Sequence, residues 1–207
     1  MWGIINEDGE VQQILWSKQS FNSRGYLHPA QVLELWSPEE LRSIGVYPAI
    51  LVAEVKRYHI YKEERVSFDG ERVVVEHVYE PLPLEDAKER AREDVNLWKQ
   101  HKQDSVFEWR GHPFQCDPRS RDFIIGRALD AFIAHSLGQP YSIEFRDANN
   151  VDHTLDAPDM IDLGKSAAAH VQHYHDEARL LKAQIDNAGS VDELISIVEG
   201  IDVPEVA

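Results

Sequence analysis

The stretch Phe107–Gly126, FEWRGHPFQCDPRSRDFIIG, is where the sequence changes from a strand pattern to a helix pattern. Apolar residues alternate in two short runs, and Gly111 and Pro113 bend the chain between them. Asp117 followed by Pro118 is a typical helix start, because aspartate accepts free amide hydrogens and proline fits the first helical turn. The stretch therefore predicts strand-like chain that leads directly into a helix.

Cys116 is the only cysteine of the chain and lies close in sequence to His112 and Asp117, so a thiol nucleophile is one hypothesis. A catalytic cysteine usually takes its histidine from elsewhere in the fold, and no local signature of such enzymes surrounds this one. Cys116 alternates with Phe114, as residues on one strand face do, so we interpret it as a small buried apolar side chain. A single cysteine forms no internal disulfide, which favours a reducing compartment.

The C-terminal part, residues 105–207, is predicted as a small α+β domain. A helix runs from about Asp117 to Leu137, a hairpin covers Tyr141–Asp156, a long helix follows from Pro158 to about Asn187, and a short helix begins at Val191. The first of these helices is apolar nearly all round, so we expect it at the centre of the core. Its apolar residues are Phe123, Ile124, Ile125, Leu129, Phe132 and Ile133.

Residues 1–83 are predicted as a β-rich docking domain. Asp8-Gly9 and Asp69-Gly70 favour two hairpins, since this pair readily supplies the positive φ of a tight turn. Residues 49–61 alternate as a strand does, and Ser37–Glu40 form a capping box for a short helix.

Residues 84–104 are predicted as a connecting helix between the two domains, which gives an α+β fold class overall. A narrow apolar stripe runs along this otherwise charged helix. We expect the stripe to lie on the neighbouring sheet; a seam between copies of the chain is the alternative. The stripe consists of Leu84, Ala87, Ala91, Val95 and Trp98.

The chain has 37 acidic and 21 basic residues, for a formal net charge of −16. A protein that binds nucleic acid through its phosphates needs basic surface, so we expect no nucleic-acid partner. The same charge is unsuited to an anionic membrane surface, and no stretch approaches the ~20 apolar residues of a membrane span. The first residues lack the basic and apolar segments of a signal peptide.

The metal candidates are His170, His173 and Glu177, which share one side of a helix at spacings of three and four residues. The order of residues in the zinc-protease helix motif is absent, so packing of His170 beside the apolar stripe is the competing interpretation. We find no catalytic constellation and no cofactor motif. The candidates for contact with a partner are four of the five tryptophans, which also suit a core: Trp2, Trp16, Trp36 and Trp98.

Residues 105–188 as a whole resemble a domain of unknown function that recurs in tailed bacteriophages and prophages. The resemblance rests on many positions in order, and Cys116 departs from it where the family often has a small polar residue. The segment LWSPEELRSIGVYP, residues 35–48, also looks like a segment common near the start of phage tail proteins. The matching positions are Phe114, Asp117, Ser120, Asn149, Thr154, Leu155, Ala168, Ala169, His170, Leu181, Lys182 and Ile185.

In that family the domain lies at the C-terminal end of tail, tail-fibre and tail-fibre-assembly proteins, and it has no established catalytic residues. The resemblance therefore implies a non-enzymatic structural protein of a phage tail, baseplate or fibre attachment that is made in the host cytoplasm and binds other tail proteins, with homo-oligomers among its assemblies. The alternative is a tail-fibre assembly chaperone that is absent from the mature virion. A metal- or thiol-dependent enzyme is a third hypothesis, of another class.

Overall fold

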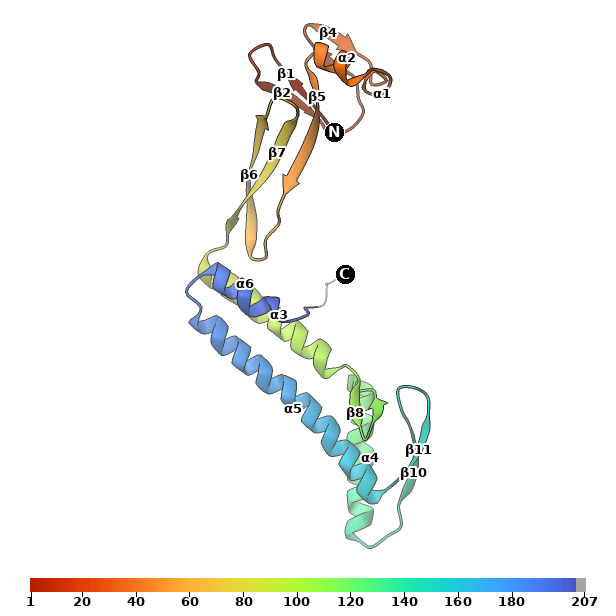
Figure 1. Ribbon diagram of the computed structural model, residues 1–207. Coiled ribbons are helices and arrows are strands. Elements are labelled where there is room, and N and C mark those ends of the chain that lie inside the picture. Colours follow the sequence, from red (N-terminus) through yellow and green to blue (C-terminus); the bar gives the residue numbers. More distant parts are fainter. Residues whose placement is uncertain (204–207) are drawn as a thin grey trace. The chain divides into compact units, whose positions relative to one another are not determined.

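The computed structural model describes residues 1–203 and divides the chain into two compact units, Met1–Leu82 and Pro83–Ala207 (Figure 1). The last residues of the predicted C-terminal domain, 204–207, lie outside the described residues. The first unit is rich in strands, and the second consists mainly of helices with two short antiparallel strand pairs among its described residues. This arrangement confirms the predicted α+β fold class.

The first unit contains one five-stranded sheet. Its strands are β1 (Trp2–Ile5), β2 (Val11–Leu15), β5 (Val46–Ala53), β6 (His59–Phe68) and β7 (Val73–Pro81), in the spatial order β2-β1-β5-β7-β6. Neighbouring strands are antiparallel except β5 and β7, which are parallel. Both predicted hairpins, β1–β2 and β6–β7, are confirmed.

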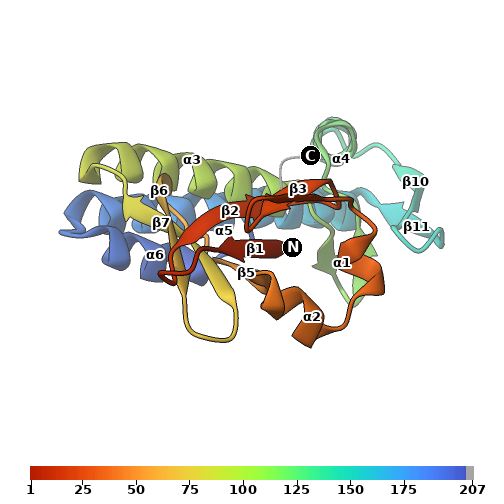
Figure 2. The same ribbon diagram turned by 90° about the horizontal axis from the view of Figure 1, so that it is seen from above.

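A small subassembly is inserted between β2 and β5. It consists of the hairpin β3 (Phe21–Ser23) and β4 (Tyr26–His28), followed by α1 (Val32–Leu35) and α2 (Pro38–Ser43) (Figure 2). The predicted capping box is present, because the Ser37 hydroxyl accepts from the Glu40 amide and the Glu40 carboxylate accepts from the Ser37 amide. The core of this region buries Ile4, Leu15, Phe21, Val32, Leu33, Leu41 and Val46.

The prediction of one strand over residues 49–61 is wrong. β5 ends at Ala53 and β6 begins at His59, so the chain reverses where the alternating pattern continued. Tyr58 has φ +59° and is buried, and its carbonyl accepts from the Leu82 amide. The reversal allows β7 to lie between β5 and β6, and alternation along a sequence does not reveal such a change of direction.

The second unit is built around two long helices. Its elements are α3 (Leu84–Gln103), β8 (Phe107–Trp109), β9 (His112–Phe114), α4 (Pro118–Ser136), β10 (Ser142–Arg146), β11 (Asp152–Asp156), α5 (Ala157–Asn187) and α6 (Val191–Glu199). In Figure 1, α3 runs beside α5, α4 crosses the N-terminal part of α5, and the β10–β11 hairpin lies next to α4. No helix within residues 1–203 combines the length and the apolar character needed to cross a membrane.

The apolar stripe of α3 is buried against helices. Trp98 packs edge-on against Tyr174 of α5, and Arg92, near the middle of α3, forms an ion pair with Asp186 of α5 at 2.6 Å. The prediction that a neighbouring sheet covers the stripe is therefore wrong, because α5 and α6 cover it. The buried members of the stripe are Ala87, Ala91, Val95 and Trp98.

The expectation that α4 lies at the centre of the core is also wrong. Only one side of the helix, with Ile124 and Ala131, is buried. That side packs so closely on α5 that a methyl group on Gly164 would meet the side chain of Ala128. Apolar residues on the other sides are 49% to 58% exposed: Phe123, Ile125, Leu129, Phe132 and Ile133.

Candidate interaction surfaces

The β8–β9 hairpin, which lies within Phe107–Gly126, is bonded to α5. Its two-residue turn has positive φ at both positions, Arg110 (+50°) and Gly111 (+80°), and glycine supplies this conformation without steric cost. The Trp109 indole donates to Asp162 at 3.0 Å, and the Arg110 guanidinium lies 4.5 Å from the centre of the Trp109 ring. Arg110 also donates to Asp159 at 2.6 Å, so the hairpin has a structural role in holding α5.

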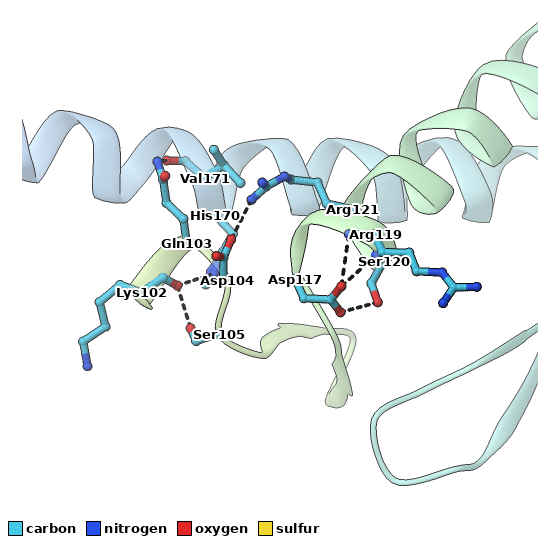
Figure 3. A network of polar contacts seen from close by, with 10 residues as sticks. All are labelled: Lys102, Gln103, Asp104, Ser105, Asp117, Arg119, Ser120, Arg121, His170 and Val171. Atoms are coloured by element: carbon cyan, nitrogen blue, oxygen red, sulfur yellow. Dashed lines mark hydrogen bonds and ion pairs between the residues drawn. The ribbon is translucent and has the colours of Figure 1, made fainter. Parts of the chain in front are cut away.

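A polar network joins the end of α3, the start of α4 and the middle of α5 (Figure 3). Arg121 of α4 pairs with Asp104 at 3.3 Å, and the Gln103 amide donates to the Val171 carbonyl of α5 at 2.9 Å. Asp117 caps α4 by accepting from the Arg119 and Ser120 amides. These contacts join three helices and so have a structural role.

Cys116 lies beside this network and is fully buried. Burial raises the pKa of its thiol, while the nearby Arg121 acts in the opposite sense. The thiol therefore remains protonated at neutral pH, whereas a nucleophilic cysteine needs an accessible thiolate. This geometry supports the interpretation of Cys116 as a packing residue.

The three metal candidates of the long helix have separate surroundings. The His170 ring lies against Phe107 and Tyr174, and its Nε2 donates to the Lys102 carbonyl at 3.0 Å. His173 Nε2 lies 3.4 Å from the Glu177 carboxylate on the exposed side of α5. The Nε2 atom of His170 is thus bonded to a carbonyl of α3. Of the three candidates, His173 and Glu177 approach each other.

A different cluster, His112, Asp147 and His153, brings three ligand atoms within 4.8 Å of one another. Asp147 Oδ1 accepts from the Asn149 and Val151 amides, and Oδ2 lies 2.9 Å from His153 Nε2. These bonds show that the Asp147 carboxylate holds the turn of the predicted β10–β11 hairpin together. Sequence spacing gave no signal for the cluster, because His112 comes from the other hairpin.

The four tryptophans predicted as partner contacts differ in exposure. Trp98 is buried between α3 and α5, and Trp2 is half-buried against the core of the first unit. Trp16 and Trp36 are exposed, and Trp36 lies edge-on to His28. Of these four residues, Trp16 and Trp36 are accessible to a partner.

An exposed apolar surface occupies the β3–β4 hairpin and α1 of the first unit. Tyr26 and Leu27 are each 72% exposed, and Leu35 at the end of α1 is 79% exposed. We call this surface the N-terminal apolar cap, and define it as Tyr26, Leu27, Leu35 and Trp36. The ring contact of Trp36 with His28 brings the end of α1 to the β3–β4 hairpin, and large exposed apolar side chains that gather on one surface are typical of sites that bind other proteins.

A second exposed apolar surface follows the outer side of α4. Gly126 lies within it, and no atom of residues 1–203 outside its own neighbourhood lies within 4 Å of where a side chain on Gly126 would begin. A glycine inside a helix costs about 1 kcal/mol relative to alanine, and no packing contact among the described residues of the second unit requires it here. We call this surface the α4 stripe, and define it as Ile125, Leu129, Phe132, Ile133 and Leu137.

A groove with a volume of about 820 Å³ lies between α5 and α6. It is open and mainly apolar, with Leu180, Ala183 and Ile197 among its lining residues. Asp192 and Glu193 also line it, but both stand in the first turn of α6, where acidic side chains are favoured by the helix dipole. The groove is better suited to apolar contact than to acid–base chemistry.

Comparison with known proteins places the second unit in a family. A family model described as a domain of unknown function (DUF4376) matches residues 86–201, which covers α3 through α6. No curated protein and no solved structure matches the chain. Because the family model spans more than half of the sequence, the chain belongs to the DUF4376 family.

Proposed function

We propose that this protein is a non-enzymatic structural component of a bacteriophage tail, at the baseplate or the tail-fibre attachment, and that it binds other tail proteins. The observation that carries the proposal is the N-terminal apolar cap. The sequence resemblance of residues 105–188 to a domain recurrent in phage tail proteins supplies the biological setting.

The N-terminal apolar cap supports binding through side chains. Tyr26 and Leu27 stand on β4 and Leu35 ends α1, and each of these three residues is at least 72% exposed. Trp36 directly follows α1 and is 37% exposed. Tyrosine and tryptophan at such places bury much area at little entropic cost when a partner arrives.

The sheet edge offered by β6 is unsuited to strand addition. It carries Lys62, Glu63, Glu64 and Arg65 in succession, and these charged side chains are exposed. Charged residues on an edge strand oppose pairing with another chain. A partner of the first unit is therefore expected at the N-terminal apolar cap.

The proposal is tested in a phage or prophage that encodes this chain. Mass spectrometry of purified particles should detect the protein, and Leu35→Asp should lower its incorporation because a charge then enters the docking surface. Val55→Asp is the matched control, since Val55 is 71% exposed on the same unit but outside the cap. Absence of the wild-type protein from mature particles would overturn the structural role.

The assembly chaperone is the second candidate, and the same experiment separates the two. A chaperone would be needed for a fibre to trimerise when the two are co-expressed, and it would then be missing from both fibre and virion. The acidic surface, with its net charge of −16, suits a freely soluble chaperone equally well.

A further inference from the structure

We infer that His112, Asp147 and His153 form a binding site for one divalent transition-metal ion, of which zinc fits best. His112 begins β9, Asp147 directly follows β10, and His153 belongs to β11, so the site lies where the two hairpins of the second unit meet. This inference stands independently of the proposed function, because it needs no tail partner and uses no residue of the N-terminal apolar cap.

The three side chains come close enough to share one ion. Each offers one ligand atom, and these three atoms lie within 4.8 Å of one another. His153 Nε2 and Asp147 Oδ2 are 2.9 Å apart. Ligand atoms at about 2.0–2.2 Å from a tetrahedral zinc ion stand about 3.4 Å from each other, so the widest separation has to close by about 1.4 Å at most. A rotation of the His112 side chain can supply this movement, because His112 is exposed.

The Asp147 carboxylate is already oriented as a metal ligand would be. Its side chain is 2% exposed, and its Oδ1 accepts from the Asn149 and Val151 amides at 2.8 and 2.9 Å. Hydrogen bonds to one carboxylate oxygen hold the other in place, as the outer contacts of metal ligands do. A zinc ion between Asp147 Oδ2 and His153 Nε2 would take the place of the hydrogen in their present hydrogen bond.

The two hairpins are joined by contacts of their own, so the site is largely formed before an ion binds. The Ala148 amide donates to the Pro113 carbonyl at 2.8 Å, and these two residues are the sequence neighbours of two of the ligands. The Phe114 ring lies against the His153 ring, with 5.8 Å between their centres. A preorganised site loses little conformational freedom on binding, which favours affinity.

His112 is the residue that the hairpin turn does not explain. The turn uses the two amide bonds of Asp147, and His153 adds one bond to the same carboxylate. His112 takes no part in these bonds, yet its ring centre lies 4.4 Å from that of His153. Two imidazoles this close repel each other when both are protonated, whereas a metal ion binds the neutral form of both. A shared cation therefore accounts for the second histidine.

The kinds of ligand select the class of metal. Imidazole nitrogens suit zinc, nickel and copper, whereas calcium and magnesium take oxygen ligands. Three protein ligands leave one position of a tetrahedral zinc ion for water, and solvent reaches the site because His112 is exposed. The net charge of −16 also attracts cations to the chain.

Calorimetric titration with zinc chloride tests the inference on the full-length protein, purified without a histidine tag and stripped of metal with EDTA. We expect one zinc ion to bind per chain. We also expect saturating zinc to raise the melting temperature by several degrees, because an ion that binds the folded state stabilises it.

His112→Ala is the decisive variant, because it removes one ligand and leaves the bonds of Asp147 in the turn intact. We expect it to weaken zinc binding at least about tenfold. The matched control is His173→Ala: His173 is also an exposed histidine beside a carboxylate, 3.4 Å from Glu177, and its loss should leave zinc affinity as in the wild type. Circular dichroism checks that both variants are folded.

Nuclear magnetic resonance identifies the ligands directly. Added zinc should shift the ring signals of His112 and His153 and leave those of His173 in place. A protein that binds no zinc would overturn the inference, as would zinc binding that His112→Ala leaves unchanged. Loss of binding in His173→Ala alone would move the site to α5 and overturn it too. Several weakly bound ions per chain, insensitive to both variants, would show only a general attraction of cations by the acidic surface and would equally overturn it.

Discussion

A methyl group added to Gly164 would lie 2.5 Å from the Cβ of Ala128, closer than real side chains approach. Gly164 belongs to the buried side of α5, and Ala128 belongs to the side of α4 that faces it. The crossing of these helices therefore depends on the absence of a side chain at one position.

We predict that Gly164→Ala lowers the free energy of unfolding by about 1–3 kcal/mol, since extra volume in a packed contact forces the helices apart. Urea denaturation measures the change. Gly126→Ala is the control: it has open space around it, and we expect it to raise the unfolding free energy by about 0.5–1 kcal/mol. Equal destabilisation by both substitutions would contradict the helix crossing described above.

His170 should make stability depend on pH in the mildly acidic range. Burial lowers its pKa, while the hydrogen bond to the Lys102 carbonyl acts in the opposite sense. The unfolded chain therefore binds a proton more readily than the folded chain as the pH falls below about 6.5, and stability is lost there.

We predict that His170→Gln reduces the loss of melting temperature between about pH 7.5 and about pH 5.5. The glutamine keeps an amide donor but cannot be protonated in this range. His173→Gln, on the exposed side of the same helix, is the control and should change the pH dependence less than His170→Gln does. Differential scanning fluorimetry checks both, and a wild-type slope for His170→Gln would refute the assignment.

Asp147 should be required for the β10–β11 hairpin. The hydrogen bond with His153 is the main cause that lowers its pKa, and the Val151 amide contributes next. Since its folded pKa lies below the ordinary value of about 3.9, its contribution to stability is present above that pH and is lost as the pH falls through the lowered pKa.

We predict that Asp147→Asn lowers the melting temperature by several degrees at neutral pH, because the amide group cannot accept all the bonds that the carboxylate accepts. Amide hydrogen exchange should show faster exchange at Asn149 and Val151. Asp152→Asn is the control: its ion pair with Arg146 at 2.8 Å is on the surface, where such pairs contribute little. A hairpin that keeps its protection in Asp147→Asn would contradict this role.

Cys116 should be unreactive in the native protein. Its thiol is buried, and burial raises its pKa, so the thiolate fraction at neutral pH is small. We predict that iodoacetamide labels it only after unfolding in guanidinium, as followed by intact-mass spectrometry. Fast labelling of the folded protein would instead revive the hypothesis of a thiol enzyme.

Local elements could be predicted where the sequence marks their ends. Ser37, Asp117 and Asp156 each cap a helix in the structure, and the Asp69-Gly70 turn joins two paired strands. These signals act within a few residues, and the chemistry that they use is complete in the sequence itself.

The sequence did not show which elements pack against one another, and this became clear only from the structure. The apolar residues of α4 predict a helix correctly, but their pattern does not tell whether the same chain or another covers them. The parallel pairing of β5 with β7 and the contact of His112 with His153 join segments that no local rule connects. Burial and proximity depend on such long-range neighbours. The predicted position of α4 at the centre of the core was wrong for this reason, and the contacts of His170 with Phe107 and the Lys102 carbonyl could not be read from its spacing.

The length of α5 gives the second unit a mechanical property. Its 31 residues extend over about 46 Å at the rise of an α-helix, and α3 lies beside it as a brace. α4 crosses this rod in its N-terminal part, whereas α6 lies at the opposite end. α5 therefore sets the distance between the α4 stripe and α6, so partners bound at these two places would be held at a fixed separation.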